Sequence, residues 1–508
     1  MKRSRGAAPA PGRRLPLVSR RPALAVALVA ATALTACGGS SSTPSAGGPT
    51  SSAATSAASA TAAPASATAA SSTAAASASA PAATKAPSAA PSAGSASEKP
   101  VACSASATKL TMWGWAAGYN LVVNEFNRTH PDICVTLENN GAANDEYVKI
   151  GNTIKAKSGA PDIAEVEYFS LPSFEITKSL VDLTKFGVND YKSKIAPVAW
   201  QQASQGSAVY AMPVDLGPLV QYYNSTLLKK YAITVPTTWA DFATAAAKLH
   251  SADPTATLAN IDPENAQAVL ALMQEDNAFP FTYTGGSSVG INFTGAAETA
   301  FATYWQDLLS KKEATTVADF SPAQWANFDG GINAVRFSPA WGPVGMQLSM
   351  KKTIGAWQAA PMPQAKAGDN LSGNWGGSTV AVFAQSKHQA AAAQFAEWFG
   401  GSDAAWKILS GPIAGAFPAY LPLLNDPSFL ARKLPISGDT TPNTVFATAA
   451  QHMVAPQWPP FMTAALTQWT TSFAGVTKGT TTLPDAFKNY QDAMVKYAKS
   501  QGFTVTTS

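Results

Sequence analysis

Downstream of residue 104, apolar positions alternate between strand-like and helix-like patterns. Strand patterns cover 109–115, 133–138 and 162–167, and helical patterns cover 119–128 and 147–158 between them. Strands that alternate with helices are typical of a parallel sheet covered by helices, so we predict an α/β fold. The roughly 400 residues of this region exceed what one hydrophobic core usually supports, and we expect two domains.

The first 36 residues have the composition of an export signal. Seven Lys and Arg residues precede an apolar run at 23–33, about half of the ~20 residues that a membrane-spanning helix needs. The run ends in Leu34-Thr35-Ala36-Cys37, which resembles the bacterial lipobox. That resemblance implies cleavage before Cys37 and a lipid on its sulfur. Export through the general or the twin-arginine route stays open, with the general route favoured.

Residues 37–103 are predicted to be the lipidated cysteine followed by a tether. From 38 to about 100 the chain is almost wholly Ala, Ser, Thr, Pro and Gly, without an aromatic residue. Such a segment buries too little apolar surface to offset its conformational entropy, so we expect it to stay disordered. About 60 flexible residues would span on the order of 45 Å. A spacer that serves solubility alone is the alternative.

Charge and motifs argue against several function classes. The leader carries seven of the 35 basic residues, so the mature chain has 28 basic against 31 acidic residues, a net charge of −3, which gives no support to nucleic-acid binding. The four histidines lack metal-ligand spacing, and no Walker loop, nucleophile elbow or dinucleotide fingerprint occurs. We therefore expect no metal and no cofactor.

Two cysteines remain after lipidation of the third. Cys103 lies just ahead of the first predicted strand and Cys134 lies inside the second. Consecutive strands are often neighbours in a sheet, and disulfides persist outside the cell, so a structural bridge is favoured. Two unlinked thiols are the alternative.

Several segments, in their order and spacing, resemble the extracellular sugar-binding proteins of ABC importers, the group that includes maltose-binding protein. They are LTMWGW at 110–115, VNEFN at 123–127, APDIA at 160–164, VYAMPVD at 209–215, QYYN at 221–224, VPTTWADF at 235–242 and NWGGS at 374–378, the last ahead of an apolar strand and an Ala-rich helix at 389–399.

The resemblance implies a two-lobed periplasmic-binding-protein-like (type II) fold, with hinges and a ligand cleft between the lobes. Lobe 1 would comprise 104–215 plus 376–425, and lobe 2 would comprise 216–375 plus 426–508. The chain would cross near 215–219 and 375–377, and again within 425–445. The resemblance also implies a carbohydrate ligand, an ABC permease as partner and a lipid-anchored position on the extracellular face of the membrane. We expect a monomer that is not an enzyme.

A pyranose offers a C–H face that packs on aromatic rings and hydroxyls that need fixed donors and acceptors. Ligands of open α/β sheets sit beyond the carboxyl ends of strands, where Trp115, Tyr168 and Asp215 fall. Asp215 is predicted to accept sugar hydroxyls, and a turn-capping role is its alternative. Beside Tyr168, Glu167 is the second choice, because alternation along a strand sends successive side chains to opposite faces.

Tryptophans in loops supply the stacking candidates. Trp375 precedes Gly376, where a glycine lets the backbone approach a ligand, and Trp341 and Trp458 lie in loops punctuated by proline. Core packing is the alternative for each. Arg336 could bind a sugar hydroxyl or close a lobe with an acidic partner, and a surface ion pair is the favoured interpretation. Helical apolar spacing or a helix start assigns five other tryptophans to the core: Trp239, Trp305, Trp398, Trp406 and Trp469.

The predicted function is therefore that of a lipid-anchored solute-binding protein which captures a carbohydrate, with an oligosaccharide favoured, and delivers it to an ABC permease. A secreted glycan-acting hydrolase is one alternative, although no motif pairs the two carboxylates that such an enzyme needs. A sugar receptor for a sensor kinase is the other, and it would use the same cleft.

Overall fold

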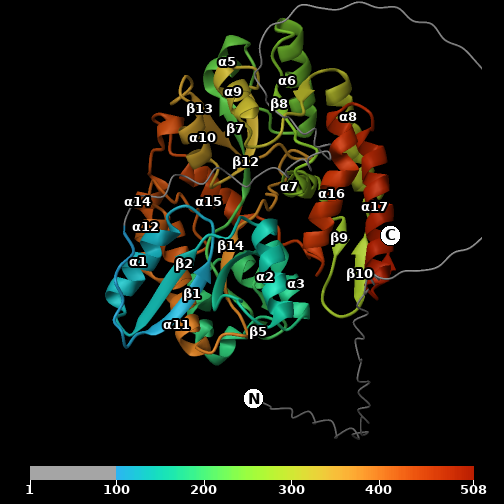
Figure 1. The fold of residues 1–508 in the computed structure, drawn as a ribbon. Coiled ribbons are helices and arrows are strands. Elements are labelled where there is room, and N and C mark those ends of the chain that lie inside the picture. The colour runs from blue at the N-terminus through green and yellow to red at the C-terminus, as the bar shows by residue number, and fades with distance from the viewer. Residues whose placement is uncertain (1–98, 508) are drawn as a thin grey trace, which may run out of the picture. The chain divides into compact units, whose positions relative to one another are not determined.

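The computed structural model describes residues 99–507 (Figure 1). The predicted signal peptide, the lipidation site at Cys37 and nearly all of the predicted tether lie outside the described residues. Among the residues that are described, no helix is both long enough and apolar enough to cross a membrane.

The first sheet contains five strands in the order β2-β1-β3-β14-β6. Its strands are β1 (Thr108–Trp113), β2 (Ile133–Glu138), β3 (Ile163–Glu167), β6 (Ala211–Pro213) and β14 (Ser378–Val382). β1 pairs in parallel with β2 and β3, whereas β14 is antiparallel to β3 and β6. The predicted α/β class is confirmed, and the parallel arrangement holds for the first three strands. β14 breaks it because it enters the sheet from a distant part of the chain.

The helices of this region follow the predicted pattern closely. α1 (Tyr119–Thr129) and α2 (Asn144–Ala156) connect the first three strands. On α1, Val122, Val123 and Phe126 are buried, which is the three- and four-residue spacing of an amphipathic helix. The remaining helices of this part of the chain are α3 (Leu171–Ile176), α4 (Pro197–Gln202), α11 (Gln389–Gly401) and α12 (Asp403–Leu409), with the two short strands β4 (Ser204–Gln205) and β5 (Ala208–Val209).

A second sheet is built around β7 (Leu219–Asn224), which begins six residues after β6 ends. β12 (Val335–Pro339) and β13 (Trp357–Ala360) flank it, both antiparallel. Smaller sheets pair β8 (Ala259–Asn260) with β11 (Ala314–Thr315), and β10 (Ser288–Ile291) with β9 (Phe281–Thr282) and β15 (Thr504–Thr506). The helices between these strands are α5 (Ser225–Lys230), α6 (Trp239–Ala252), α7 (Ala266–Glu275), α8 (Ala296–Ser310), α9 (Pro322–Gly330) and α10 (Pro343–Ser349).

Helices make up most of residues 421–503, ahead of β15, and they are coloured orange to red in Figure 1. The short α13 (Leu421–Leu424) and α14 (Pro427–Leu430) precede α15 (Asn443–Gln451), and the long α16 (Met462–Thr477) and α17 (Leu483–Ser500) pack against each other. Between the last two, Trp469 and Phe473 stack with centroids 4.1 Å apart, and both rings contact Tyr490. This aromatic seam is part of the core.

Four of the five tryptophans assigned to the core are fully or nearly buried: Trp239, Trp305, Trp406 and Trp469. Trp398 is half-buried and packs on Phe126 and His130 at the edge of the core. The helix start predicted before Trp239 is confirmed as well. Thr238 caps α6 and forms a reciprocal capping box with Asp241.

The structure joins Cys103 to Cys134 in a disulfide, with Cα atoms 5.7 Å apart. The register pairs Lys109 of β1 with Cys134 of β2, which brings the segment ahead of β1 alongside β2. Asn124 of α1 holds the same segment, because its side chain accepts a hydrogen bond from the Val101 N–H and donates to the Lys99 carbonyl. The start of the described chain is therefore fixed at three points.

Candidate ligand-binding site

Two chain segments run side by side where the polypeptide passes from the first sheet to the second. After β6, Pro218 forms an isolated bridge with Asn374 of the returning segment. Asp215 forms another bridge with Pro418, which belongs to a third segment. The two segments approach so closely that a Cβ atom on Gly217 would lie 2.0 Å from the Trp375 carbonyl oxygen. Glycine at this position is a steric requirement, because any side chain would push the segments apart.

Asp215 closes the turn between these segments. Its Oδ1 atom accepts a 2.6 Å hydrogen bond from the Ser378 N–H, and its carbonyl accepts one of 3.3 Å from the Tyr168 hydroxyl. Burial raises the pKa of Asp215 to about 6. The Ser378 hydrogen bond joins residues 163 positions apart and is not the local turn cap given above as the alternative, so the contact of Asp215 with sugar hydroxyls stays a prediction. Tyr168, which is 2% exposed, anchors the same turn rather than offering its hydroxyl to solvent.

Two glutamates of β3 lie beside this turn. Glu165 is buried, and it accepts hydrogen bonds from the backbone N–H groups of Trp115 and Ala116 and from the Ser378 hydroxyl. Burial raises its pKa to about 7. Its side chain therefore fixes the loop after β1 to β14.

Glu167 is half-buried at the end of β3. Its carboxylate accepts a 3.2 Å hydrogen bond from the Tyr147 hydroxyl, which in turn accepts one from the Glu167 N–H. Burial and the charge of Glu165 raise the pKa of Glu167 to about 8, and hydrogen bonds from Tyr147 and Gln267 oppose that shift. Because Gln267 belongs to α7, Glu167 links β3 to a helix that follows the second sheet's central strand.

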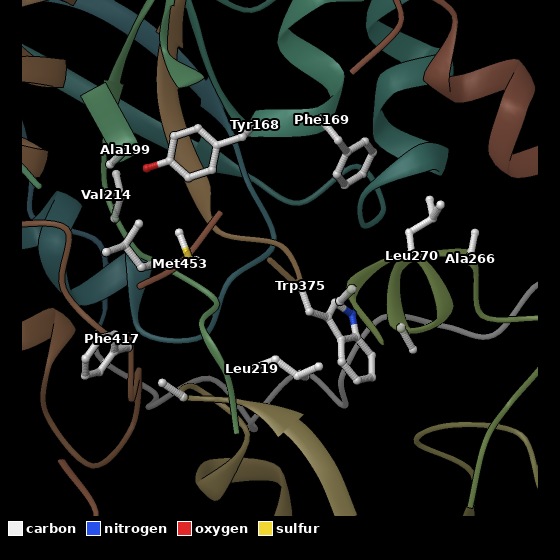
Figure 2. Close-up of a cluster of buried hydrophobic side chains, with 14 of the residues drawn as sticks. Tyr168, Phe169, Ala199, Val214, Leu219, Ala266, Leu270, Trp375, Phe417 and Met453 are labelled. Carbon is white, nitrogen blue, oxygen red and sulfur yellow. The ribbon is translucent and has the colours of Figure 1, made fainter. Parts of the chain in front are cut away.

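Trp341 and Trp375 meet close to Glu167. Their ring centroids are 6.1 Å apart at 74°. Gly376 lies between them and the carboxylate, because an added Cβ there would be 3.5 Å from Glu167 Oε1 and 4.0 Å from Trp341 Nε1. Trp375 is 3% exposed and packs among buried apolar side chains that include Leu219 and Leu270 (Figure 2), whereas Trp341 is half-buried. The structure thus brings four predicted residues together.

The two remaining predicted aromatics lie on either side of this group. Trp115 is half-buried and meets the ring of Tyr147 edge-on at 5.7 Å, next to Glu167. Trp458 precedes α16 and meets Phe169 at 6.3 Å. Its indole Nε1 is buried and has no hydrogen-bond partner in the described part of the chain. Phe169 directly follows Tyr168, so Trp458 approaches the same turn of the first region.

α7 forms hydrogen bonds with the segment at 373–374, which returns from the second sheet to the first. The Gly373 N–H donates to Glu275 and the Asn374 N–H donates to Gln274, at 2.6 and 2.7 Å. The side-chain amide of Asn374 also donates to Gln202 of α4, at 2.8 Å. Burial raises the pKa of Glu275 well above its ordinary value. Helices of both regions therefore hold the segment that carries Trp375.

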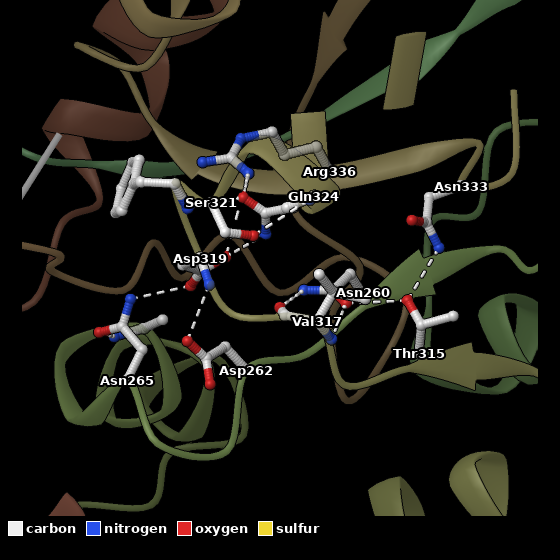
Figure 3. A network of polar contacts seen from close by, with 12 residues as sticks. Asn260, Asp262, Asn265, Thr315, Val317, Asp319, Ser321, Gln324, Asn333 and Arg336 are labelled. Atoms are coloured by element: carbon white, nitrogen blue, oxygen red, sulfur yellow. Dashed lines mark hydrogen bonds and ion pairs between the residues drawn. The ribbon is translucent and has the colours of Figure 1, made fainter. Parts of the chain in front are cut away.

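A buried polar network supports the loop after β11 (Figure 3). Asp319 accepts a 2.8 Å hydrogen bond from Asn265, and its own N–H donates to Asp262. Arg336 is 2% exposed, lies 4.0 Å from Asp319 and donates to Gln324 at 2.9 Å. The interpretation of Arg336 as a surface ion pair is therefore wrong. Its position on β12, inside the second sheet, places the guanidinium in the interior, where it faces the ring of Trp325.

Sequence reasoning missed three contributors to this site. The sequence pattern gives Tyr147 a place in a helix but no role, and it singles out neither Gln267 nor Phe320, although Phe320 contacts both Trp341 and Trp375. The segment Ser321-Pro322-Ala323-Gln324 matches the Ser-x-x-Gln pattern of a helix start, and that signal would have marked Phe320 as the residue just before a cap. Contacts from α7 carry no comparable local signal.

No group of three or more His, Cys, Asp or Glu side chains within residues 99–507 is arranged to hold a metal ion. The site instead combines buried and partly exposed aromatic rings with carboxyl groups that lie within hydrogen-bonding distance of neighbouring donors. Such an arrangement can bind a ligand that has both apolar faces and hydroxyl groups.

Known proteins resemble this chain over most of its length. Residues 114–406 match the family model described as bacterial extracellular solute-binding protein. An arabinooligosaccharide-binding protein of Bacillus subtilis (strain 168) is 24% identical over 321 residues, which cover 59% of this chain and 72% of that protein.

Solved structures agree with the sequence match. The ABC transporter associated binding protein from B. animalis subsp. lactis Bl-04, in complex with beta-1,6-galactobiose, has a TM-score of 0.70 at 27% identity. The galacto-N-biose-/lacto-N-biose I-binding protein of the ABC transporter from Bifidobacterium longum, in complex with lacto-N-biose, has a TM-score of 0.70 at 26% identity. Each comparison covers 79% of this chain and 100% of the other. The chain therefore belongs to the bacterial extracellular solute-binding proteins and has their two-lobed α/β fold.

Proposed function

We propose that this protein captures a carbohydrate, with an oligosaccharide favoured, in a cleft between two lobes and delivers it to an ABC permease. The lobes would comprise 104–215 plus 376–425 and 216–375 plus 426–508. The observation that carries the proposal is the meeting of Trp341 and Trp375 beside Gly376 and Glu167, at the place where the chain crosses between the two sheets.

The chemistry of this group suits a sugar. A partly exposed indole such as that of Trp341 offers an apolar face for the C–H side of a pyranose. Carboxyl groups such as that of Glu167 bind the hydroxyls of the sugar. With a pKa of about 8, the Glu167 carboxyl is mostly protonated near pH 7, so it can donate as well as accept a hydrogen bond. The names of the relatives, which state complexes with disaccharides or binding of oligosaccharides, support the same class of ligand.

The proposed mechanism involves binding and no covalent step. A ligand that contacts residues of both lobes stabilises the closed arrangement, and the population shifts by as much as its affinities for the two arrangements differ. Glu167 of β3 and Trp341 after β12 belong to different sheets and would contact one ligand from two sides. Closure would then present the surface that the permease recognises.

The lipid anchor and the location are part of the proposal. Cleavage before Cys37 and lipidation of its sulfur would hold a monomer on the extracellular face of the membrane. Fatty-acid labelling in cells tests this directly. We expect label on the chain and none on Cys37→Ser, which should appear in the medium, whereas label on both or on neither contradicts the anchor.

We would identify the ligand by using a secreted form of the protein that begins at residue 37 and carries Cys37→Ser. Thermal shift and calorimetry would be run with arabinotriose, beta-1,6-galactobiose, lacto-N-biose and maltose, and with amino acids and polyamines for comparison. A ligand at about a hundred times its dissociation constant should stabilise the protein by roughly 2.7 kcal/mol. We expect stabilisation by one sugar class, weakened in Trp341→Ala, and no hydrolysis of that sugar. Stabilisation by a non-sugar solute alone would refute the carbohydrate assignment.

A further inference from the structure

Phe320 has a backbone conformation that is unusual for an aromatic residue. Its φ angle is 60°, in the left-handed region that L-residues with bulky side chains rarely adopt. The residue is half-buried, and its ring lies nearly parallel to that of Trp341, at 24° and 6.3 Å between centroids. It also meets Trp375 at 6.0 Å. A strained residue thus lies against both tryptophans of the proposed cleft.

Neighbouring side chains stabilise this conformation. The Phe320 N–H donates a 2.8 Å hydrogen bond to Gln324 Oε1, and that oxygen also accepts from Arg336 at 2.9 Å. Gln324 is 1% exposed, and its amide donates to Asp319, the residue before Phe320. Figure 3 shows Asp319, Gln324 and Arg336 converging on this loop. Because backbone strain costs free energy, it persists where the surroundings over-determine the conformation, as they do here.

Part of this arrangement is core packing, because Phe320 is partly buried against the core and the Arg336 guanidinium lies over its ring, 5.4 Å from the centroid. A phenylalanine that serves only the core gains most when its ring is fully buried, as Phe328 and Phe337 are in the same region. Phe320 nevertheless keeps part of its surface exposed, as Trp341 does. The two rings are nearly parallel, and Trp341 approaches Gly376, which neighbours the Glu167 carboxyl. The left-handed conformation therefore places a partly exposed ring beside Trp341.

We infer that Phe320 is a ligand-contacting residue which extends the aromatic surface of Trp341, and that Gln324 is a positioning residue which holds its ring in place. This inference rests on the proposed function, because it names a further contact for the same carbohydrate. It also restricts the ligand class. A sugar bound there must offer a C–H face large enough to cover parts of two rings, which favours two or more sugar units over one.

The first test compares the affinities of Phe320 variants for the sugar that the panel identifies, by calorimetry on the secreted form. Phe320→Ala removes the ring and should weaken binding at least about tenfold, whereas Phe320→Trp and Phe320→Tyr should stay within a few-fold of the wild type. Phe320→Gly removes the ring and also relieves the strain. It should melt at a higher temperature than Phe320→Ala and bind equally weakly.

The second test separates positioning from general structural support through a double-mutant cycle. Gln324→Ala should weaken binding in the wild-type background and have little further effect when Phe320→Ala is already present. An equal loss in both backgrounds would mean that Gln324 does not act through the Phe320 ring.

The outcomes distinguish this inference from the proposed function. If the wild-type protein binds no sugar of the panel, the function fails before any variant is compared. If it binds a sugar and Phe320→Ala binds that sugar as tightly, with an unchanged melting temperature, the inference is overturned and the function stands. Monosaccharides that bind as tightly as the corresponding disaccharides would overturn the restriction on ligand size.

Discussion

Glu165 links the stability of the protein to pH. Its carboxyl is 1% exposed, and burial raises its pKa from 4.5 to about 7. The folded state therefore holds a proton that the unfolded chain has released between these pH values. The stabilisation is fully present below about pH 4.5 and is lost as the pH rises through 7, by about 1.4 kcal/mol per pH unit for one such group. Glu167, whose pKa rises to about 8, and Asp262, whose pKa is raised by burial and by the charge of Asp319, act with the same sign.

We expect the free energy of unfolding, measured with urea, to fall between pH 5 and pH 8. Glu165→Gln is a matched variant, because one amide oxygen can accept from Trp115 and Ala116 while its NH₂ donates to Ser378. Its stability should fall less steeply with pH. An equal slope in both proteins would show that Glu165 does not titrate in this range.

At Gly217, a single residue determines how closely two chain segments approach each other where the chain crosses between the sheets. A Cβ atom there would collide with the Trp375 carbonyl, so Gly217→Ala should destabilise the protein by about 1–3 kcal/mol. Because the collision displaces the segment that carries Trp375, ligand affinity should fall as well. Gly151→Ala is the control, since its Cβ would meet nothing within 4 Å and alanine favours the helix α2. Equal destabilisation of both variants in urea would contradict the steric account.

At the scale of the element, the sequence pattern and the structure agree best where the determinants are local. Apolar spacing predicted β2 to the residue, and Thr238 and Asp241 form the expected start of α6. Thr238→Ala should cost about 0.5–2 kcal/mol in chemical denaturation, because it removes one half of a capping box. Thr244→Ala, on the exposed face of the same helix, should cost nothing or stabilise slightly. If the two variants are equally destabilising, the cap is not the cause.

At the scale of the whole molecule, the disulfide limits the freedom of the unfolded chain. Cys103 and Cys134 are 31 residues apart in sequence, and a loop of that size should contribute about 3–4 kcal/mol in the chain-entropy model. We expect the double variant Cys103→Ser, Cys134→Ser to melt at a lower temperature, and reductant to lower the melting temperature of the wild type alone. The decrease in melting temperature on reduction should persist at every pH tested, whereas the contribution of Glu165 to stability changes with pH. A wild type that ignores reductant would contradict a stabilising bridge.

The α/β class, the first strands and helices and the family can be predicted from the sequence, because these follow from spacings within short windows and from motifs in a fixed order. Trp341, Trp375, Gly376 and Glu167 are separate candidates at that level. The meeting of these four residues, the hydrogen bond from Tyr168 to Asp215 and the burial of Arg336 are visible only in the folded chain. The antiparallel place of β14 and the contact of Phe320 with both tryptophans were decided there too. Those outcomes depend on contacts between residues that no short window of the sequence contains, or on the strain of one backbone angle, and neither leaves a periodic pattern in the chain.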